Sequence, residues 1–400
     1  MAFSSDTIKE TIGEREAEIR QPGTLLFSQA RYQIRRVLGE GGMGITCLAD
    51  EYSHRDLKRP VVLKFVKDSL DPQRMAQFIN EVELSILFNH PNLVPIYRLE
   101  SEMLTVEVSE KGRKRTRTHP VYYAVMQYID GWNVRQVMDR LRTLGMALNH
   151  DMAMFIVGRV ARGLHYVHEF RDANNEHLGL VHRDVSPENL LLDRFGRVKL
   201  ADFGIARPMK LAQADAWLMA GKLLYCSPEQ IDGTGIDARS DIYNIGLVMY
   251  YMFTNRERFA LERTSGRARE RIRAKMKKSA LPDLSHVHPH LAHMCDACLK
   301  EDPDGRYQSC EDLATDVDIY FKESGKVLTN EQLEETLLDL FSSKPRFVSR
   351  RYIPLTGSPR LEHPGYREKD ETRAEEPGPT LPTVRLDAED EEDEGTTSEG

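Results

Sequence analysis

A short polar loop with apolar residues on both sides constrains this chain more than any other feature. Residues 182–189 read His-Arg-Asp-Val-Ser-Pro-Glu-Asn, which places a carboxylate, Asp184, five positions before a carboxamide, Asn189. A second acid, Asp202, follows a strand-like run a short distance later. Buried flanks should hold both loops rigid. Because carboxylate and carboxamide oxygens are ligands for hard cations, the two loops together predict a metal–phosphate site.

Charge is unevenly distributed along the chain. The net charge of the 400 residues is −8, and residues 387–400 hold eight acids and no Lys or Arg, so the remainder is formally neutral. A neutral domain argues against nucleic acid as a general partner. No apolar run is long enough to insert directly into a membrane. The five scattered cysteines suit a reducing compartment, so we expect a cytoplasmic protein.

A glycine-rich turn lies near the N-terminal end. Residues 39–44 read Gly-Glu-Gly-Gly-Met-Gly, between two strand-like runs. Glycines let backbone amides approach a phosphate without a Cβ in the way. A strand rather than a helix follows the turn, which disfavours a dinucleotide fold and favours a hairpin that covers a nucleotide.

An apolar strand ends in a lysine, Lys64, and a helix is predicted over residues 72–88. A lysine on a buried strand needs a countercharge. Two acids on the helix could supply it, Glu81 and Glu83. We favour Glu81, because it shares a helix face with Ser85 where a polar pair is tolerated.

Residues 97–130 read as two strands, the second over residues 122–129. Between them, residues 111–117 read Lys-Gly-Arg-Lys-Arg-Thr-Arg. Charge runs usually lie in exposed loops, so we interpret this run as the solvated tip of a hairpin. The alternative is a basic patch that docks an acidic partner or the chain's own acidic tail.

The order of these motifs resembles that of the bacterial, eukaryotic-like (Hanks-type) serine/threonine protein kinases. The resemblance covers about residues 32–322. It implies an α+β, bilobal protein-kinase-like fold. A small β-rich N-lobe with one main helix would span about residues 32–127, and a larger, mostly α-helical C-lobe about residues 128–322.

The segments outside this region are expected to be extensions. Residues 1–31 form an N-terminal extension. Residues 323–400 form a C-terminal tail with a short helix near 331–341. Low hydrophobicity and high net charge predict disorder for the acidic segment that follows this helix.

The resemblance implies ATP and Mg²⁺, or possibly Mn²⁺, as cofactors and protein Ser/Thr hydroxyls as phosphate acceptors. Asp184 would be the catalytic base, and Asn189 and Asp202 would hold the metal. Lys64, paired with Glu81, would hold the α- and β-phosphates. The other residues implied to contact the nucleotide are Leu38, Gly39, Glu40, Gly41, Gly42, Met43, Gly44, Thr46, Val62, Met126, Gln127, Tyr128 and Leu191.

Two further motifs would have structural roles under the same resemblance. The motif Ser-Pro-Glu ends at Glu229, which would pair with Arg306. Asp241, in a predicted helix, would brace the backbone of the catalytic loop.

Two positions depart together from the pattern of the family. Ser186 stands two residues after Asp184, where these kinases usually carry a lysine, and Lys222 stands where they usually carry a threonine that touches the catalytic Asp. We hypothesise that Lys222 restores the missing cation beside the γ-phosphate, because a lysine side chain is flexible enough to approach from either side. The alternative is that Lys222 is a solvated loop residue.

The segment between Asp202 and Glu229 bears on regulation. Residues 205–220 contain no Ser, Thr or Tyr, so phosphorylation there cannot be the switch. We therefore expect control by a regulatory partner or by a homodimer. The alternative to an active enzyme is a pseudokinase scaffold that binds partners without turnover.

Overall fold

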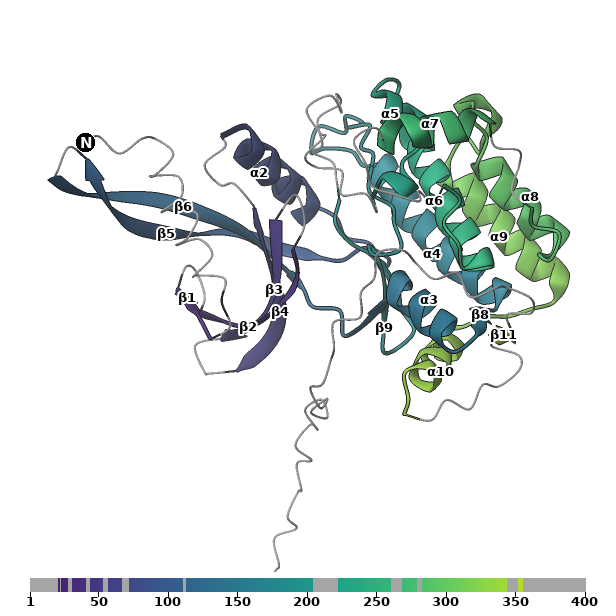
Figure 1. Ribbon diagram of the computed structural model, residues 1–400, viewed down its shortest axis with the longest axis horizontal. Coiled ribbons are helices and arrows are strands. Elements are labelled where there is room, and N and C mark those ends of the chain that lie inside the picture. Colours follow the sequence, from purple (N-terminus) through teal and green to yellow (C-terminus); the bar gives the residue numbers. More distant parts are fainter. Residues whose placement is uncertain are drawn as a thin grey trace, which may run out of the picture. The chain divides into compact units, whose positions relative to one another are not determined.

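In the computed structural model, the elements that position the predicted site belong to one unit of the chain, residues 1–357 (Figure 1). The described residues are 21, 23–27, 31–40, 44–52, 57–66, 72–110, 113–203, 222–259, 268–278, 283–343 and 352–354. Residues 1–20 of the expected N-terminal extension and the acidic end of the tail lie outside them. A second unit, residues 358–400, also lies outside them.

Six antiparallel strands form the N-lobe sheet, in the order β1-β2-β3-β4-β6-β5. Their bounds are β1 Leu25–Phe27, β2 Arg31–Glu40, β3 Gly44–Tyr52, β4 Lys58–Val66, β5 Ile96–Glu110 and β6 Arg113–Gln127. The sheet therefore begins at β1, ahead of the expected domain start at residue 32. Along β2, Tyr32 and Ile34 alternate into the core, as the period of two in a half-buried strand requires.

The main N-lobe helix, α2 Pro72–Ile86, packs on one face of this sheet. Its Phe78 and Val82 meet Val66 and Ala124 from the strands. The opposite face buries a separate cluster around Leu63. The sheet is thus buried on both faces, and successive residues of β4 point alternately toward α2 and toward the cluster around Leu63.

The C-lobe is mostly helical. Helix α4, His150–His168, is buried along most of its length and packs against α6, Ala238–Thr254, and α9, Cys310–Ser324 (Figure 1). The other helices are α3 Val134–Thr143, α5 Pro228–Asp232, α7 Ala268–Lys278, α8 Pro289–Cys298, α10 Asn330–Leu340 and the short η2 Lys222–Tyr225 and η3 Pro303–Gly305. None of the helices in the described part of the chain is long and apolar enough to cross a bilayer. The expected bilobal α+β fold is confirmed.

Two small sheets complete the C-lobe. The strands β7 Gly131–Asn133, β9 Leu190–Asp193 and β10 Val198–Leu200 pair in the order β10-β9-β7. This sheet joins the end of the polar loop at 182–189 to the start of the Asp202 loop. The strand β8 Met146–Leu148 pairs with β11 Tyr352–Pro354.

One prediction about the hairpin was wrong. The second strand runs over Arg113–Gln127 rather than over residues 122–129, so most of the basic run belongs to a strand and only residues 111–112, which lie outside the described residues, separate the strands. The physical reason is that Val and Thr alternate with the charged residues, and β-branched side chains favour a pleated strand even where charge suggests a loop.

The segment beyond residue 322 contributes to the C-lobe core. The helix expected near 331–341 is α10, and its Leu333, Leu337 and Leu340 are buried in the C-lobe cluster. Phe341 stacks on Trp132, with 4.3 Å between ring centroids and 5° between planes. This part of the tail therefore packs on the region that directly follows the predicted hinge.

Gly196, in the β9–β10 turn, provides a test of this packing. Its φ is 68°, and a Cβ there would lie 1.8 Å from the Asn330 carbonyl oxygen of α10. Gly145 has the same φ of 68° with nothing within 4 Å. Gly145→Ala is expected to cost about 1–2 kcal/mol of unfolding free energy for the left-handed backbone. Gly196→Ala should cost a further 1–3 kcal/mol or so, because α10 must move.

Urea unfolding of the two variants measures this difference. Equal losses of unfolding free energy in Gly145→Ala and Gly196→Ala would contradict the tight docking of α10 against the turn.

Candidate active site

One face of the N-lobe sheet places four predicted nucleotide contacts together. Val62 and Lys64 are two residues apart on β4, so they share a face. Across the strands, Thr46 pairs with Lys64 and Met126 pairs with Val62. Residues directly opposite in a sheet have neighbouring Cβ atoms, so these side chains form one surface.

Lys64 lies between two carboxylates. Its Nζ is 3.1 Å from Asp202 Oδ1 and 3.9 Å from Glu81 Oε1. Of the two candidate helix partners, the structure brings Glu81 to Lys64 and leaves Glu83 exposed. Burial opposes the charge of the amine, but Asp202 and Glu81 together raise the pKa of Lys64 above its usual value. Lys64 is therefore a fixed cation at neutral pH.

Each of the two polar loops of the site holds one residue in an unusual backbone conformation. Arg183 has a φ of 63° and Asp202 a φ of 59°, in the left-handed region that non-glycine residues rarely adopt. Such residues persist where the surroundings fix them. The Arg183 N–H donates to Asp241 Oδ1 at 2.8 Å, and the Arg183 carbonyl accepts from Gln230 Nε2 at 3.0 Å.

Asp241, fully buried on α6, organises this loop. Its Oδ2 accepts from the His182 N–H and lies 2.8 Å from His168 Nε2. Burial alone would raise the pKa of Asp241, but these contacts lower it below its usual value. The residue is therefore an anion that braces two successive backbone amides of the loop, as expected from its motif.

The polar groups of the loop are fixed by one another. Asn189 Nδ2 donates to the Asp184 carbonyl at 2.7 Å, which leaves the Asn189 carboxamide oxygen as its remaining acceptor. Asp184 and Asn189 are both buried, and Asp202 is partly exposed. The oxygen donors of Asn189 and Asp202 suit a hard divalent cation such as Mg²⁺, so the residues present fit the implied metal.

An apolar cluster lies between the two lobes. It joins Val62 and Met126 to Val94 and Ala201, with the predicted contact Leu191 and Tyr128 packed against it. Sequence reasoning missed Val94 and Ala201, because an apolar residue in a loop carries no chemical signature. The backbone bond from Val94 N–H to the Leu200 carbonyl, 2.9 Å, ties the lobes together here.

The remaining predicted nucleotide contacts are only partly described. Gly41, Gly42 and Met43 lie outside the described residues, between β2 and β3. A Cβ on Gly44 would lie 1.9 Å from the Phe65 carbonyl oxygen, so this position requires glycine. At the predicted hinge, the Gln127 N–H already donates to the Pro95 carbonyl at 2.9 Å, so this N–H is engaged within the protein. Leu38, Gly39 and Glu40 lie at the exposed end of β2.

The Ser-Pro-Glu motif, residues 227–229, anchors the start of α5 to the C-lobe. Glu229 receives two hydrogen bonds from Arg306, at 2.7 and 3.0 Å, and one from Ser240 Oγ at 2.7 Å. Tyr225 and Ser227, the hydroxyl residues just before Glu229, are buried. The Tyr225 hydroxyl accepts from Arg135 at 2.9 Å. Both hydroxyls therefore serve the packing of this anchor.

Of the two positions that depart from the family pattern, Ser186 is the one whose side chain the structure describes. Ser186 is buried, and its Oγ has no hydrogen-bond partner among the described residues. The backbone of Lys222 begins η2, but its side chain lies outside the described part of the structure. The proposed approach of Lys222 to the catalytic loop thus stays a prediction.

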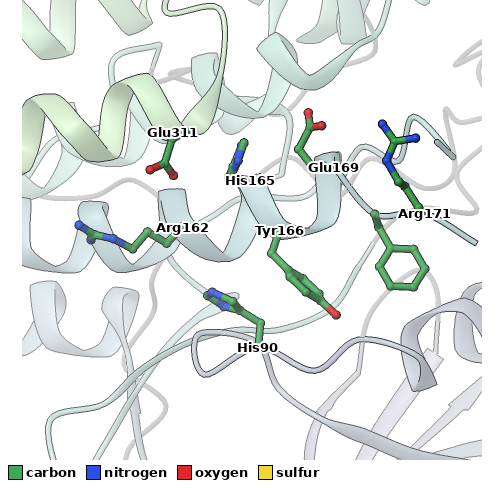
Figure 2. Close-up of a pocket in the computed structure, with 8 residues that line it drawn as sticks. His90, Arg162, His165, Tyr166, Glu169, Arg171 and Glu311 are labelled. Atoms are coloured by element: carbon green, nitrogen blue, oxygen red, sulfur yellow. The ribbon is translucent and has the colours of Figure 1, made fainter. Parts of the chain in front are cut away.

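A separate pocket of about 600 Å³ lies along α4 (Figure 2). It contains none of the predicted catalytic residues. Its lining residues are His90, Arg162, His165, Tyr166, Glu169, Phe170, Arg171 and Glu311. The His90 ring stacks on Tyr166, and the Tyr166 hydroxyl accepts from the Asn89 N–H at 3.1 Å. These contacts attach the loop after α2 to the C-lobe.

The fold and the site define a protein kinase domain. The family model described as protein kinase domain matches residues 32–317, so the chain belongs to the protein kinase family. Its relatives place it among the bacterial Hanks-type serine/threonine kinases.

Two curated relatives and one solved structure illustrate the similarity. The chain is 31% identical over 295 residues to a probable serine/threonine-protein kinase of Streptomyces coelicolor, covering 72% of this chain and 39% of that protein. It is 30% identical over 298 residues to the serine/threonine-protein kinase PknB of Mycolicibacterium smegmatis, covering 72% and 42%. The crystal structure of the Mycobacterium tuberculosis PknI kinase domain aligns with a TM-score of 0.49 and 23% identity, covering 75% of this chain and 98% of that one. The chain spans about two fifths of the length of these two curated relatives.

Proposed function

We propose that this chain transfers the γ-phosphate of ATP to Ser or Thr hydroxyls of protein substrates. The observation that carries the proposal is the meeting of a cation and a metal ligand from opposite lobes, Lys64 and Asp202, at 3.1 Å. The loop with Asp184 and Asn189 is connected to Asp202 through β9 and β10. Phosphoryl transfer needs such positioned charges more than it needs unusual side-chain chemistry.

Each residue then has a defined task. Asp184 accepts the proton of the substrate hydroxyl as the hydroxyl oxygen bonds to the γ-phosphorus and the bond to ADP breaks. Lys64 holds the α- and β-phosphates, and Glu81 keeps Lys64 in place. Asn189 and Asp202 would hold Mg²⁺, which would neutralise phosphate charge when bound.

The apolar cluster between the lobes supplies the base-binding surface. Val62, Met126, Val94 and Ala201 offer a dry, flat-sided environment for the adenine ring. Thr46, which stands where a valine is usual, makes one side of this surface more polar. This change bears on nucleotide affinity rather than on the transfer step.

The second candidate function is a pseudokinase scaffold. Its support is the replacement of the usual catalytic-loop lysine by Ser186, a buried hydroxyl without a described partner. The presence of Lys64, Asp184, Asn189 and Asp202 favours the enzyme. A scaffold that only binds partners does not require these four side chains in one site.

Lys222 is proposed to replace the missing cation. Lys222→Met is expected to lower kcat by about 10²–10³-fold with little change in the KM for ATP, because the lost charge acts mainly on the transition state. The double exchange Ser186→Lys with Lys222→Thr should recover most of the loss, since it returns the cation to the catalytic loop. Initial rates at saturating ATP measure both.

A matched control separates this role from a general effect of charge. Lys322→Met removes an exposed lysine of α9 and should leave kcat unchanged. Thermal melting of each variant checks that the fold is retained. Full activity of Lys222→Met would rule out the proposed role.

The location, the substrates and the regulation of the enzyme are also proposals. A cytoplasmic location is supported by the five cysteines, which are all buried and form no disulfide with one another. Protein substrates follow from the kinase family. A regulatory partner or a homodimer is proposed as the control, because Tyr225 and Ser227 are buried and residues 205–220 contain no Ser, Thr or Tyr.

A further inference from the structure

Arg135, in the first turn of α3, contacts the catalytic loop at residues 182–189 with both its backbone and its side chain. Its backbone N–H, one of the first-turn amides that have no partner within the helix, donates to the Pro187 carbonyl at 3.2 Å. Its Nε donates to Glu188 Oε1 at 2.9 Å. Because Glu188 directly precedes Asn189, Arg135 holds the chain next to a proposed Mg²⁺ ligand.

The other two nitrogens of the same guanidinium group hold residues outside this loop. Nη2 donates to the Tyr225 hydroxyl at 2.9 Å, and Nη1 donates to Glu257 Oε1 at 2.6 Å. Tyr225 is the last residue of η2, the short helix that begins at Lys222. A guanidinium group carries its donors in a fixed plane, so it can serve three partners at once. Arg135 thereby joins the catalytic loop to η2.

Tyr225 is held at its backbone and at its hydroxyl by different elements. Its carbonyl accepts from Asn244 Nδ2 of α6 at 2.6 Å, whereas its hydroxyl accepts from Arg135. The Tyr225 ring meets the Tyr251 ring edge to face, with 6.3 Å between the ring centroids. Loss of the Arg135 side chain would therefore release the hydroxyl end of Tyr225 and leave the bond to α6 in place.

The stability of α3 does not account for an arginine at this position. The N-cap of α3 is Asn133, so Arg135 lies at the helix N-terminus, where the helix dipole disfavours a cation. Its partner Glu188 is half exposed, and exposed ion pairs add little to the stability of a fold. The contacts of Arg135 are thus better explained by the two segments that they bring together.

We propose that Arg135 is a positioning residue that sets the catalytic loop against η2 for transfer to the protein substrate. The inference rests on the proposed kinase function. Asn189 and Lys222 belong to the two segments that Arg135 joins, and a shift of about 1 Å in a reacting geometry can lower the rate by about 10²-fold. Among the described residues, the partners of Arg135 include none of the predicted nucleotide contacts, so nucleotide affinity should not depend on it.

Substitution of Arg135 tests this role. Arg135→Met is expected to lower kcat by about 10–100-fold, with the KM for ATP and the Kd for ADP unchanged. Arg135→Lys keeps the charge but has one nitrogen in place of three, so it should recover only part of the loss. Initial rates at saturating ATP, with one protein substrate at a fixed concentration, measure the effect.

Arg142→Met is the matched control on the same helix. Arg142 Nη2 donates to the carbonyl and to Oδ1 of Asn255, at 3.1 and 2.9 Å, so it attaches α3 to the end of α6. These contacts do not involve the catalytic loop. Arg142→Met should therefore keep the transfer rate, and thermal melting of each variant checks that the fold is retained.

A double-mutant cycle shows whether Tyr225 acts through Arg135. Tyr225→Phe removes only the hydroxyl and keeps the buried ring. In the unmodified chain it should slow transfer by about 3–10-fold, within the usual range of coupling between residues in contact. In the Arg135→Met background the same change should slow transfer by less than about twofold, because the bond is already absent. A purely structural role of either residue would not produce this dependence.

The possible results separate this inference from the proposed function. A full transfer rate in Arg135→Met, or an equal loss in Arg142→Met, would overturn the role of Arg135 and leave the kinase function intact. The same holds if Tyr225→Phe has an equal effect in both backgrounds. Absence of transfer by the unmodified chain would overturn the proposed function and this inference with it.

Discussion

Replacing Asp184 with Asn is expected to lower the rate of phosphoryl transfer by about 10²–10⁴-fold, the usual contribution of a general base. Asn has the same shape but cannot accept the hydroxyl proton. The bond from Asn189 Nδ2 goes to the Asp184 main-chain carbonyl, which the substitution does not alter. Nucleotide binding should therefore be retained. Single-turnover rates and the Kd for ADP, measured on the same preparation, separate the two effects.

The control for Asp184→Asn is the same substitution at an aspartate outside the candidate active site. Asp139, on α3, is half exposed and pairs with Arg142 on the same helix. Asp139→Asn should keep the rate of transfer. A transfer rate in Asp184→Asn equal to that of the unmodified chain would mean that Asp184 is not the base.

Replacing Arg306 with Met is expected to cost about 3–5 kcal/mol of unfolding free energy, because it leaves a buried charge without its partner. The Arg306 side chain is fully buried. It bonds to both oxygens of Glu229 and to the carbonyls of Lys300, Glu301 and Arg239. Met fills a similar volume but satisfies none of these acceptors. Urea unfolding measures the loss.

Two further variants test whether the cost comes from the pair. Glu229→Gln added to Arg306→Met should recover part of the stability, since it removes the unpaired charge. Arg239→Met breaks ion pairs that are more exposed and should cost no more than about 1 kcal/mol. A loss in Arg306→Met no larger than in Arg239→Met would contradict the account.

The same pair gives stability a pH dependence. Burial disfavours the Glu229 carboxylate, but the hydrogen bonds from Arg306 lower its pKa below the usual value. A lowered pKa in the folded state stabilises the protein above the unfolded value, and this stabilisation is lost as pH falls through the folded value. Arg306→Met is expected to reduce this contribution of the Glu229 carboxylate to the pH dependence of the free energy of unfolding.

The sequence predicted the parts of the site that carry distinctive side chains in a fixed order. Asp241, Glu229 and Arg306 were found from their motifs, and the structure places each in the expected contact. The partner of Lys64 was narrowed to two acids by helix spacing. These successes rest on local order along the chain and on the charge that a buried lysine or acid requires.

Other features depend on long-range packing, which single-sequence patterns do not report. Val94 and Ala201 become part of the apolar cluster only because the loop after α2 bonds to β10. The left-handed backbone of Arg183 and Asp202 gives no sequence signal, since neither residue is a glycine. It is imposed by contacts such as that of Arg183 with Asp241.

Helix α10 and the β5–β6 hairpin show a related limit of prediction from the sequence. The helix α10 was expected from its pattern, but its burial against α3 and the stacking of Phe341 on Trp132 were not. The basic run was interpreted as a loop because charge is the stronger local signal, whereas cross-strand backbone pairing decided its structure. The residues that α10 packs against lie far away in the sequence, and the residues that pair with the basic run lie on the neighbouring strand.

The most direct test of the central claim is transfer from labelled ATP. The purified full chain is incubated with γ-labelled ATP, Mg²⁺ and a mixed protein substrate, with Asp184→Asn in parallel, and the phosphorylated residues are identified. We predict Mg²⁺-dependent label on Ser and Thr that is lost in Asp184→Asn. Nucleotide binding without any transfer above the Asp184→Asn background would contradict the claim and identify a pseudokinase.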